Sequence, residues 1–239
     1  MIALRNVTQT VGKGSRTKEL LSGANFVFSD EHIGLIVDST ENAEVVLDLL
    51  SGIRRPQSGK IWRSGRVSWP IGRIAQYRAD LTGKATLHFL ASIYDLPFKR
   101  CEDLLFGLMD IENNYNKPLI NWPRDLLLQF GYATALMPNF EIYIVDSSIN
   151  TANEVFMEDW ENIFREKITA KQLIYFSSAE RYLEKYATRG VALIEGNFFM
   201  FEDLSTAFKA VGPINTNALG SIASGNEDDT NGTLGDFGI

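Results

Sequence analysis

Runs of apolar residues separated by polar turns divide most of the chain into strands and helices. Alternating apolar residues predict two strands near the N-terminus, at Ile2–Val7 and Ala24–Phe28. The continuous apolar run Ile33–Val37 predicts a strand that is buried on both faces. A helix is expected at 41–51, because apolar residues recur there at helical spacing and Gly52 follows as a closing residue.

The same alternation continues to about residue 201. The pattern predicts short strands at 60–62 and 66–69, a largely helical block at about 84–137, a strand at Ile142–Asp146, a helix at 152–167, a strand at Leu173–Phe176, a helix at 179–187, and strands at 190–195 and 197–201. Buried strands that alternate with helices indicate an α/β fold with a mostly parallel core sheet and right-handed crossovers. The antiparallel N-terminal strands and the helical block are additions to that core.

Composition and charge narrow the class of protein. The 239 residues are 45% hydrophobic and contain no run of the roughly 18–20 apolar residues that a membrane-spanning helix needs. The start of the chain has no basic segment followed by an apolar block, so we expect a cytoplasmic protein that a partner could hold at the inner face of the membrane.

Most of the excess negative charge lies at the C-terminal end. Of the net charge of −7, four acids fall in the last 24 residues, which contain no Lys or Arg. We predict that 216–239 is a disordered acidic tail on a single domain formed by 1–215. The remainder is close to neutral, with 26 acidic and 23 basic residues, which argues against a nucleic-acid partner.

Several short segments, in order along the chain, resemble those of the ATP-binding subunits of capsular-polysaccharide ABC exporters. The segments are Leu49-Leu50-Ser51-Gly52, Pro56–Ile61, Val67-Ser68-Trp69-Pro70, Leu81-Thr82-Gly83, Val191–Gly196 and Phe201-Glu202-Asp203. The resemblance covers about residues 1–212. It implies an ABC-type nucleotide-binding domain with a helical subdomain at about 84–137. It also implies a membrane permease as partner, and a homodimer or a pairing with a paralogous ATPase.

The phosphate-binding loop of this family has departed furthest from its pattern. The motif G-x-x-x-x-G-K-[ST] supplies backbone N–H groups, a lysine for the phosphates and a hydroxyl for Mg²⁺. Its eight positions here are Val37, Asp38, Ser39, Thr40, Glu41, Asn42, Ala43 and Glu44. Both glycines, the lysine and the final hydroxyl residue are absent, and three acids lie where phosphates would bind.

Charge repulsion at this loop predicts that no cofactor is bound. A carboxylate about 6 Å from one phosphate charge costs roughly 3 kcal/mol at an effective dielectric constant near 20. Asp38 and Glu41 have the spacing of a capping box, so we expect a vacant turn that satisfies its own N–H groups. The alternative is a modified site for ATP and Mg²⁺ at the remnant positions Val37, Asp38, Asn42, Ala43 and Glu44.

Most other catalytic positions of the family have also lost the residue that the family has there. The resemblance places a Mg²⁺-binding acid at Asp146, which is kept, and the water-activating Glu at Ser147. Loss of a general base costs about 10²–10⁴-fold in rate. Ser178 stands at the position of the switch His, and Val11 stands at the position of the adenine-stacking aromatic residue. Pro123–Leu126 occupies the position of the glycine-containing signature turn. No catalytic residue is therefore predicted, and Asp146 is the one candidate metal ligand.

Three functions are compatible with these observations. The first is a catalytically degenerate subunit, a pseudo-ATPase, with a docking or regulatory role in polysaccharide export. The second is a genuine ATP-binding subunit that acts in a heterodimer, which the loss of both phosphate loop and signature turn disfavours. The third is a different enzyme on the same scaffold, for which no nucleophile elbow or paired acids are present.

Overall fold

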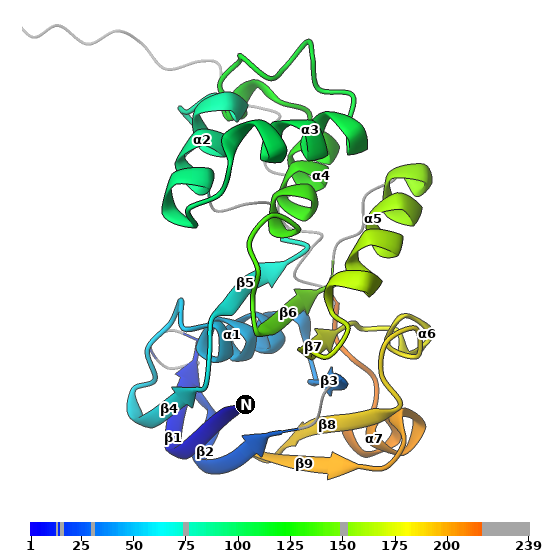
Figure 1. The fold of residues 1–239 in the computed structure, drawn as a ribbon. Helices are drawn as coiled ribbons and strands as arrows, with labels where there is room; N and C mark the ends of the chain where they lie inside the picture. Colours follow the sequence, from blue (N-terminus) through cyan, green and yellow to red (C-terminus); the bar gives the residue numbers. More distant parts are fainter. Residues whose placement is uncertain (13, 15–16, 30–31, 74–76, 149–152, 217–239) are drawn as a thin grey trace, which may run out of the picture.

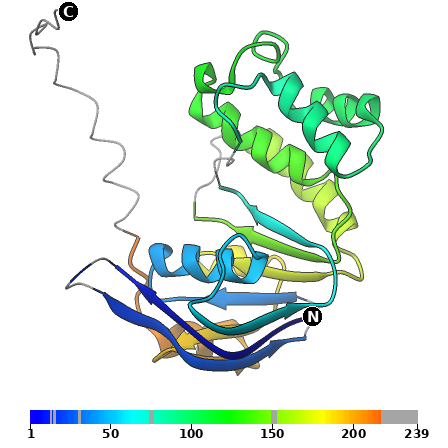
Figure 2. The ribbon, with the colours of Figure 1, turned by 90° about the vertical axis from the view of Figure 1, so that its left-hand side faces the viewer.

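The computed structural model describes residues 1–12, 14, 17–29, 32–73, 77–148 and 153–216. These residues form two sheets with helices between and around them, and a group of helices projects from one end (Figures 1 and 2). Among the described residues, no helix combines the length and apolar character that crossing a bilayer requires. Of the predicted tail at 216–239, residues 217–239 lie outside the described residues.

The larger sheet has six strands in the order β5-β6-β7-β3-β8-β9. Its parallel part consists of β5 (Val67–Ile71), β6 (Ile142–Asp146), β7 (Gln172–Phe176), β3 (His32–Ile36) and β8 (Arg189–Ile194). The edge strand β9 (Asn197–Phe201) pairs antiparallel with β8. Every residue of β6 and β7 is buried, in keeping with strands covered on both faces.

The smaller sheet is antiparallel and has the order β2-β1-β4. It contains β1 (Ile2–Val11), β2 (Lys18–Phe28) and β4 (Ser58–Arg63). Helix α1 (Thr40–Ser51) packs between this sheet and the larger one, because its apolar residues share one core cluster with strands of both. Arg63 fixes the end of α1 by donating from Nε to the Leu50 carbonyl at 2.7 Å, and Gly52 closes the helix with φ of 90°.

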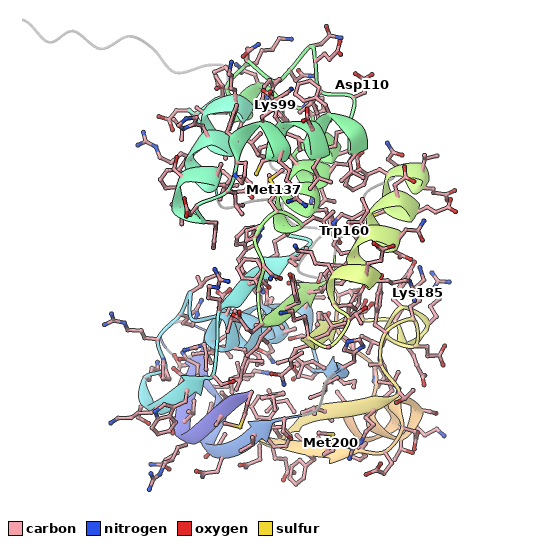
Figure 3. All side chains as sticks on the ribbon, in the orientation of Figure 1. Lys99, Asp110, Met137, Trp160, Lys185 and Met200 are labelled. Carbon is pink, nitrogen blue, oxygen red and sulfur yellow. The ribbon has the colours of Figure 1, made fainter. Side chains whose placement is uncertain are left out.

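The helical block projects from the edge of the larger sheet that β5 forms (Figure 1). It comprises α2 (Gly83–Ile93), α3 (Phe98–Leu108), the short 3₁₀ helix η2 (Leu119–Asn121) and α4 (Arg124–Ala135). Helix α5 (Glu154–Lys167) packs against α4 of the block, and its Trp160, labelled in Figure 3, donates its indole N–H to the Tyr132 carbonyl at 2.9 Å.

The predicted α/β fold, with its antiparallel start and helical insertion, is confirmed. Several elements differ from the sequence pattern. Strand β1 continues beyond the predicted end to Val11, and β2 already begins at Lys18. Helix α6 (Glu180–Leu183) is shorter than the predicted helix at 179–187, and α7 (Leu204–Val211) was not predicted. Asp203 caps α7 by accepting a hydrogen bond from the Thr206 N–H at 2.7 Å.

Candidate nucleotide-binding site

The turn between β3 and α1 is capped by its own side chains. Ser39 is the N-cap residue, and its hydroxyl accepts from the Asn42 N–H at 3.2 Å. The Ser39 carbonyl accepts from the Ala43 N–H at 2.9 Å, and Asp38 accepts from the Asn42 side chain at 2.6 Å. The capping box that we predicted between Asp38 and Glu41 is wrong by one residue, because the helix starts at Thr40 and so makes Ser39 the cap.

A segment from the far end of the described chain lies against the same turn. Asn215 forms an isolated parallel bridge with Ser39. Its carbonyl accepts from the Thr40 N–H at 3.1 Å, and its N–H donates to the Asp38 carbonyl at 2.8 Å. The first N–H groups of a helix have no acceptor within the helix, so Asn215 satisfies one that would otherwise face solvent or a ligand.

A hollow of about 520 Å³ opens beside the turn. This volume is in the range of small-molecule sites. Its lining comes from β1, β2, the turn, α1 and the C-terminal segment, namely Val11, Gly12, Lys18, Asp38, Ser39, Glu41, Asn42, Glu44, Val45, Arg54 and Asn215. The remnant positions Asp38, Asn42 and Glu44 thus lie together on one cavity, whereas Val37 and Ala43 are fully buried in the core beneath it.

Cations from other segments offset much of the acidity of this hollow. Lys18 lies 3.8 Å from Asp38, and Arg54 lies 3.7 Å from Asp48 on α1. The lining contains two cations, Lys18 and Arg54. It contains three acids, Asp38, Glu41 and Glu44, so its net charge is about −1. The charge count over eight consecutive residues, which predicted strong repulsion of a phosphate, omitted both cations.

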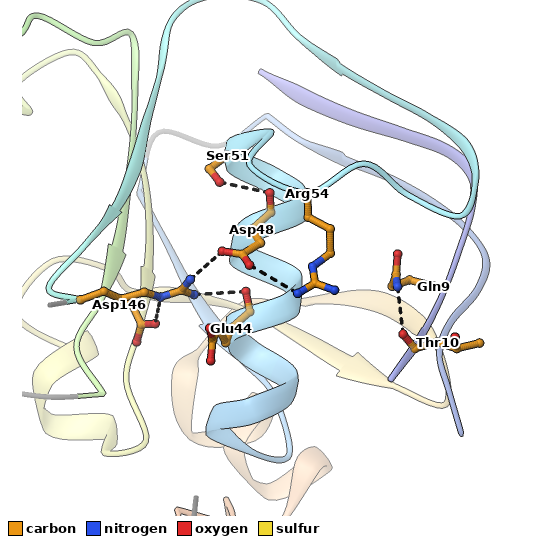
Figure 4. A network of polar contacts seen from close by, with 8 residues as sticks. Gln9, Thr10, Glu44, Asp48, Ser51, Arg54 and Asp146 are labelled. Atoms are coloured by element: carbon orange, nitrogen blue, oxygen red, sulfur yellow. Dashed lines mark hydrogen bonds and ion pairs between the residues drawn. The ribbon is translucent and has the colours of Figure 1, made fainter. Parts of the chain in front are cut away.

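Arg73 is held between two buried carboxylates at the end of the sheet (Figure 4). Its Nε donates to Asp146 at 2.7 Å and its Nη1 to Asp48 at 2.6 Å, while Nη2 donates to the Glu44 carbonyl at 3.1 Å. Burial is the largest influence on the pKa of the Arg73 guanidinium and lowers it, but Asp146 and then Asp48 outweigh burial, so the net shift is upward. The guanidinium therefore links α1, β5 and β6 as a fixed cation.

Asp146 uses both of its carboxylate oxygens within the protein. Arg73 occupies Oδ2, while Oδ1 accepts from the Ser148 N–H at 3.1 Å and from the Ser148 hydroxyl. A metal ion at Asp146 would have to displace these partners. The described residues contain no group of three His, Cys, Asp or Glu side chains arranged to hold a metal.

The remaining family positions lie along the same end of the sheet or on α4. Ser147 is buried and follows Asp146, and its N–H donates to the Phe176 carbonyl at 2.9 Å. Its side chain also bonds Tyr175, whose pKa burial raises to about 12 in spite of that bond. Ser178 follows the end of β7 and is partly exposed. The segment Pro123–Leu126 forms the first turn of α4, where Asp125 accepts from Gln129 at 2.6 Å.

The sequence did not reveal Lys18, Arg54, Arg73 or Asn215 as site residues. Arg73 carried a usable signal, because it comes two residues after Ile71, which pairs with Val145 in the parallel register. The carboxyl ends of neighbouring parallel strands meet at one edge, so Arg73 and Asp146 meet once the strand order is known. Lys18 begins β2, Arg54 lies in the turn after α1, and Asn215 lies in the C-terminal segment, so their approach to the site depends on tertiary structure.

Known proteins of similar sequence include two bacterial ATP-binding proteins. No family model matches the chain. It is 25% identical over 210 residues to the ATP-binding protein BexA of Haemophilus influenzae, covering 87% of this chain and 97% of BexA. It is 22% identical to the capsule polysaccharide export ATP-binding protein CtrD of Neisseria meningitidis, over 75% of this chain and 83% of CtrD. The chain is related to the ATP-binding proteins of capsular-polysaccharide ABC exporters.

Solved structures with the same fold are ATP-binding cassettes. The ATP-binding cassette MJ0796, in a dimeric post-hydrolysis state bound to ADP and Pi, superposes with a TM-score of 0.66 at 16% identity, covering 84% of this chain and 98% of MJ0796. An ATP-binding subunit of an ABC transporter gives a TM-score of 0.67 at 15% identity, covering 93% and 99%. These likenesses establish the cassette fold.

The comparisons correct the prediction that the chain takes no cofactor. Its relatives are named as ATP-binding proteins, and a cassette of the same fold holds ADP and phosphate. The prediction was wrong because it weighed the side chains of one loop alone. The hollow beside that loop has the size of a small-molecule site, and Lys18 and Arg54 in its lining offset part of the acidity that the prediction counted.

Proposed function

We propose that this chain is a nucleotide-binding but non-hydrolysing subunit of a capsular-polysaccharide ABC exporter, in which it docks on a membrane permease at the inner face of the membrane. Nucleotide occupancy would regulate the docked subunit without providing energy by hydrolysis. We further propose that it acts in a dimer, as the cassette MJ0796 does in its solved dimeric state.

The observation that carries the loss of hydrolysis is the contact of Arg73 with Asp146. The Arg73 guanidinium lies 2.7 Å from the carboxylate that the family resemblance makes the Mg²⁺-binding acid, so a cation of the protein already pairs with it. The next residue, Ser147, is a buried hydroxyl at the position of the general base. A serine hydroxyl is not a base near neutral pH, so water at this position would not be activated.

Retained nucleotide binding is supported by the shape and charge of the hollow. The aliphatic Val11 and the cations Lys18 and Arg54 line one cavity of about 520 Å³. An aliphatic side chain in place of an aromatic one and three nearby acids would weaken binding. We therefore expect an affinity for ATP in the upper micromolar to millimolar range, on the order of −4 to −6 kcal/mol.

The docking role is supported by a second hollow, of about 600 Å³, between the helical block and α5. Its lining is mostly apolar, with Arg100, Lys167 and Glu166 among it, and the complete set is Leu96, Pro97, Arg100, Cys101, Leu104, Leu136, Met137, Asn139, Ile163, Glu166 and Lys167. Burial, Arg100 and Lys171 lower the pKa of the Lys167 ammonium. An acidic, amphipathic helix of the permease would suit this surface, because it would bury the apolar lining and compensate both cations.

Helix α2 of the same block also carries exposed aromatic and aliphatic residues. Phe89 and Ile93 are four residues apart and are 58% and 57% exposed. Side chains at this spacing lie on one face of a helix. Large apolar side chains that gather on one exposed helix face are typical of an interaction surface.

Equilibrium binding and hydrolysis, measured on the same preparation, test the proposal. Isothermal titration with Mg-ATP is expected to show saturable binding, while phosphate release stays at the level of the Asp146→Asn variant. Circular dichroism would first establish that this variant is folded. Phosphate release that is clearly above background in the natural chain and falls in Asp146→Asn would contradict the proposal.

A further inference from the structure

The chain that follows α7 turns back across the start of α1. Helix α7 ends at Gly212, which has φ of 81° and donates its N–H to the Phe208 carbonyl at 2.9 Å. Only a residue that tolerates positive φ makes this turn without strain, and glycine does so most readily. Ile214, half-buried, then packs against the larger core cluster, and Asn215 reaches the turn at Ser39.

Two backbone hydrogen bonds join this segment to the turn as a short parallel strand pair. The Asn215 N–H donates to Asp38, and the Asn215 carbonyl accepts from Thr40. In a phosphate-binding helix start, the free N–H groups point to the anion. Here Asn215 takes the Thr40 N–H, and Ser39 takes those of Asn42 and Ala43.

We infer that residues 213–216, here called the strap, are an autoinhibitory cover of the phosphate end of the hollow. In the closed arrangement, which the structure shows, a backbone carbonyl occupies a donor that a phosphate would use. Displacement of the strap frees the Thr40 N–H and widens the hollow, which Asn215 helps to line. This inference rests on the proposed function in one respect, namely that the hollow takes a nucleotide.

Most of the strap is exposed to solvent, which favours its displacement. Pro213, Asn215 and Thr216 are exposed, and Ile214 is the one residue of the strap with a partly buried apolar side chain. A stable cover would bury a continuous apolar surface, whereas three of the four residues of the strap are exposed. A ligand that offers a negatively charged oxygen to Thr40 can therefore compete with the neutral Asn215 carbonyl.

Two substitutions at Asn215 separate the backbone contact from the side chain. Asn215→Pro removes the N–H that bonds Asp38, whereas Asn215→Ala keeps both backbone hydrogen bonds. Without nucleotide, the Thr40 amide is expected to exchange its hydrogen about 3- to 10-fold faster in Asn215→Pro than in Asn215→Ala, the ratio that one net hydrogen bond gives. Ile214→Asp, which leaves the backbone of the strap unchanged, should accelerate exchange in the same direction. Equal protection of Thr40 in the natural chain and in the three variants would overturn the inference.

Binding of a fluorescent N-methylanthraniloyl derivative of ATP then tests what the strap controls. The Asn215→Pro and Ile214→Asp variants are expected to bind it about 3- to 10-fold more tightly than Asn215→Ala does. Equal affinities would overturn the autoinhibitory role. Absence of binding in every variant would refute the proposed nucleotide site, and faster Thr40 exchange in the same samples would still establish the displaceable contact.

Discussion

Arg73 is the residue through which three parts of the site are joined. Its side chain is 15% exposed, and its two partners Asp48 and Asp146 are 8% and 4% exposed. A buried ion pair is not in itself strongly stabilising, because desolvation of the charges offsets their attraction. Removing one partner is costly, because the other charge is left buried without compensation.

Replacement of Arg73 by methionine should therefore reduce stability sharply. We expect the free energy of unfolding to fall by about 3–5 kcal/mol, measured by urea denaturation, since buried Asp146 loses its cation and buried Asp48 keeps only the longer contact with Arg54. The matched control is Arg78→Met, because Arg78 pairs with Asp80 on the surface, where both side chains are largely exposed. That variant should leave the free energy of unfolding close to that of the natural chain, because exposed ion pairs contribute little. Equal losses in the two variants would contradict the role given to Arg73.

Gly72 illustrates how closely this residue cluster is packed. A Cβ atom there would lie 2.2 Å from the Asp146 carbonyl oxygen and 2.7 Å from the Tyr132 hydroxyl, and φ is 101°. Gly72→Ala is expected to cost more than about 2 kcal/mol in thermal or urea unfolding, because the Asp146 carbonyl cannot move away without shifting a strand. Gly107→Ala provides the control, since nothing lies within 4 Å of the place that its added methyl group would take. A loss no greater in Gly72→Ala than in Gly107→Ala would be inconsistent with this packing.

At the scale of elements, the capping of α7 gives a pH dependence. Hydrogen bonds from the Thr206 N–H and then the Thr206 hydroxyl lower the pKa of Asp203 below its ordinary value of 3.8. A carboxylate whose folded pKa is lowered stabilises at pH above the unfolded pKa, and this contribution disappears as pH falls through the folded pKa. The N-terminus of α7 should therefore fray below about pH 3.8.

The Thr206 amide resonance reports on this cap directly. Its chemical shift should titrate with an apparent pKa below 3.8 in the natural chain and lose that titration in Asp203→Asn. Asn still accepts a hydrogen bond at an N-cap, so the helix itself should remain. An unchanged titration in Asp203→Asn would assign the effect to another carboxylate.

The sequence predicted the elements with a strong internal period and missed those that depend on neighbours. The buried strands at β3, β6 and β7 were found because continuous apolar runs are typical of parallel strands. Helix α7 was missed because eight residues form too short a window for a helical period, although Asp203 is a recognisable cap. The capping residue of α1 was misplaced by one position, because Asp38 and Ser39 are both good cap residues and the backbone decides between them.

At the scale of the whole molecule, the sequence identified the cassette fold but not the charge of its cavity. Lys18 comes from β2 and Arg54 from the turn after α1, and the fold brings both beside the acids at 38–44. Electrostatic repulsion depends on all charges near a site rather than on those adjacent in sequence. The prediction that no phosphate binds at this turn counted only the turn's own acids, and those acids alone do not exclude a bound phosphate.

Charge reversal in the second hollow tests how the molecule docks. Arg100→Glu combined with Lys167→Glu should reduce binding of the exporter's detergent-solubilised permease by about tenfold or more, because like charges would then face an acidic helix. Arg5→Glu, on the exposed side of β1, is the control and should bind as the natural chain does. If both proteins bind the permease equally, the docking surface lies elsewhere.

The central claim is that this cassette holds a nucleotide without cleaving it, and a single-turnover measurement tests it most directly. The chain, in excess over ATP labelled in the γ-phosphate, is incubated with Mg²⁺, and the label is separated into ATP and inorganic phosphate over several hours. We expect the label to stay in ATP, while equilibrium dialysis of the same mixture shows the nucleotide bound to the protein. Release of labelled phosphate at a rate that Asp146→Asn abolishes would contradict it.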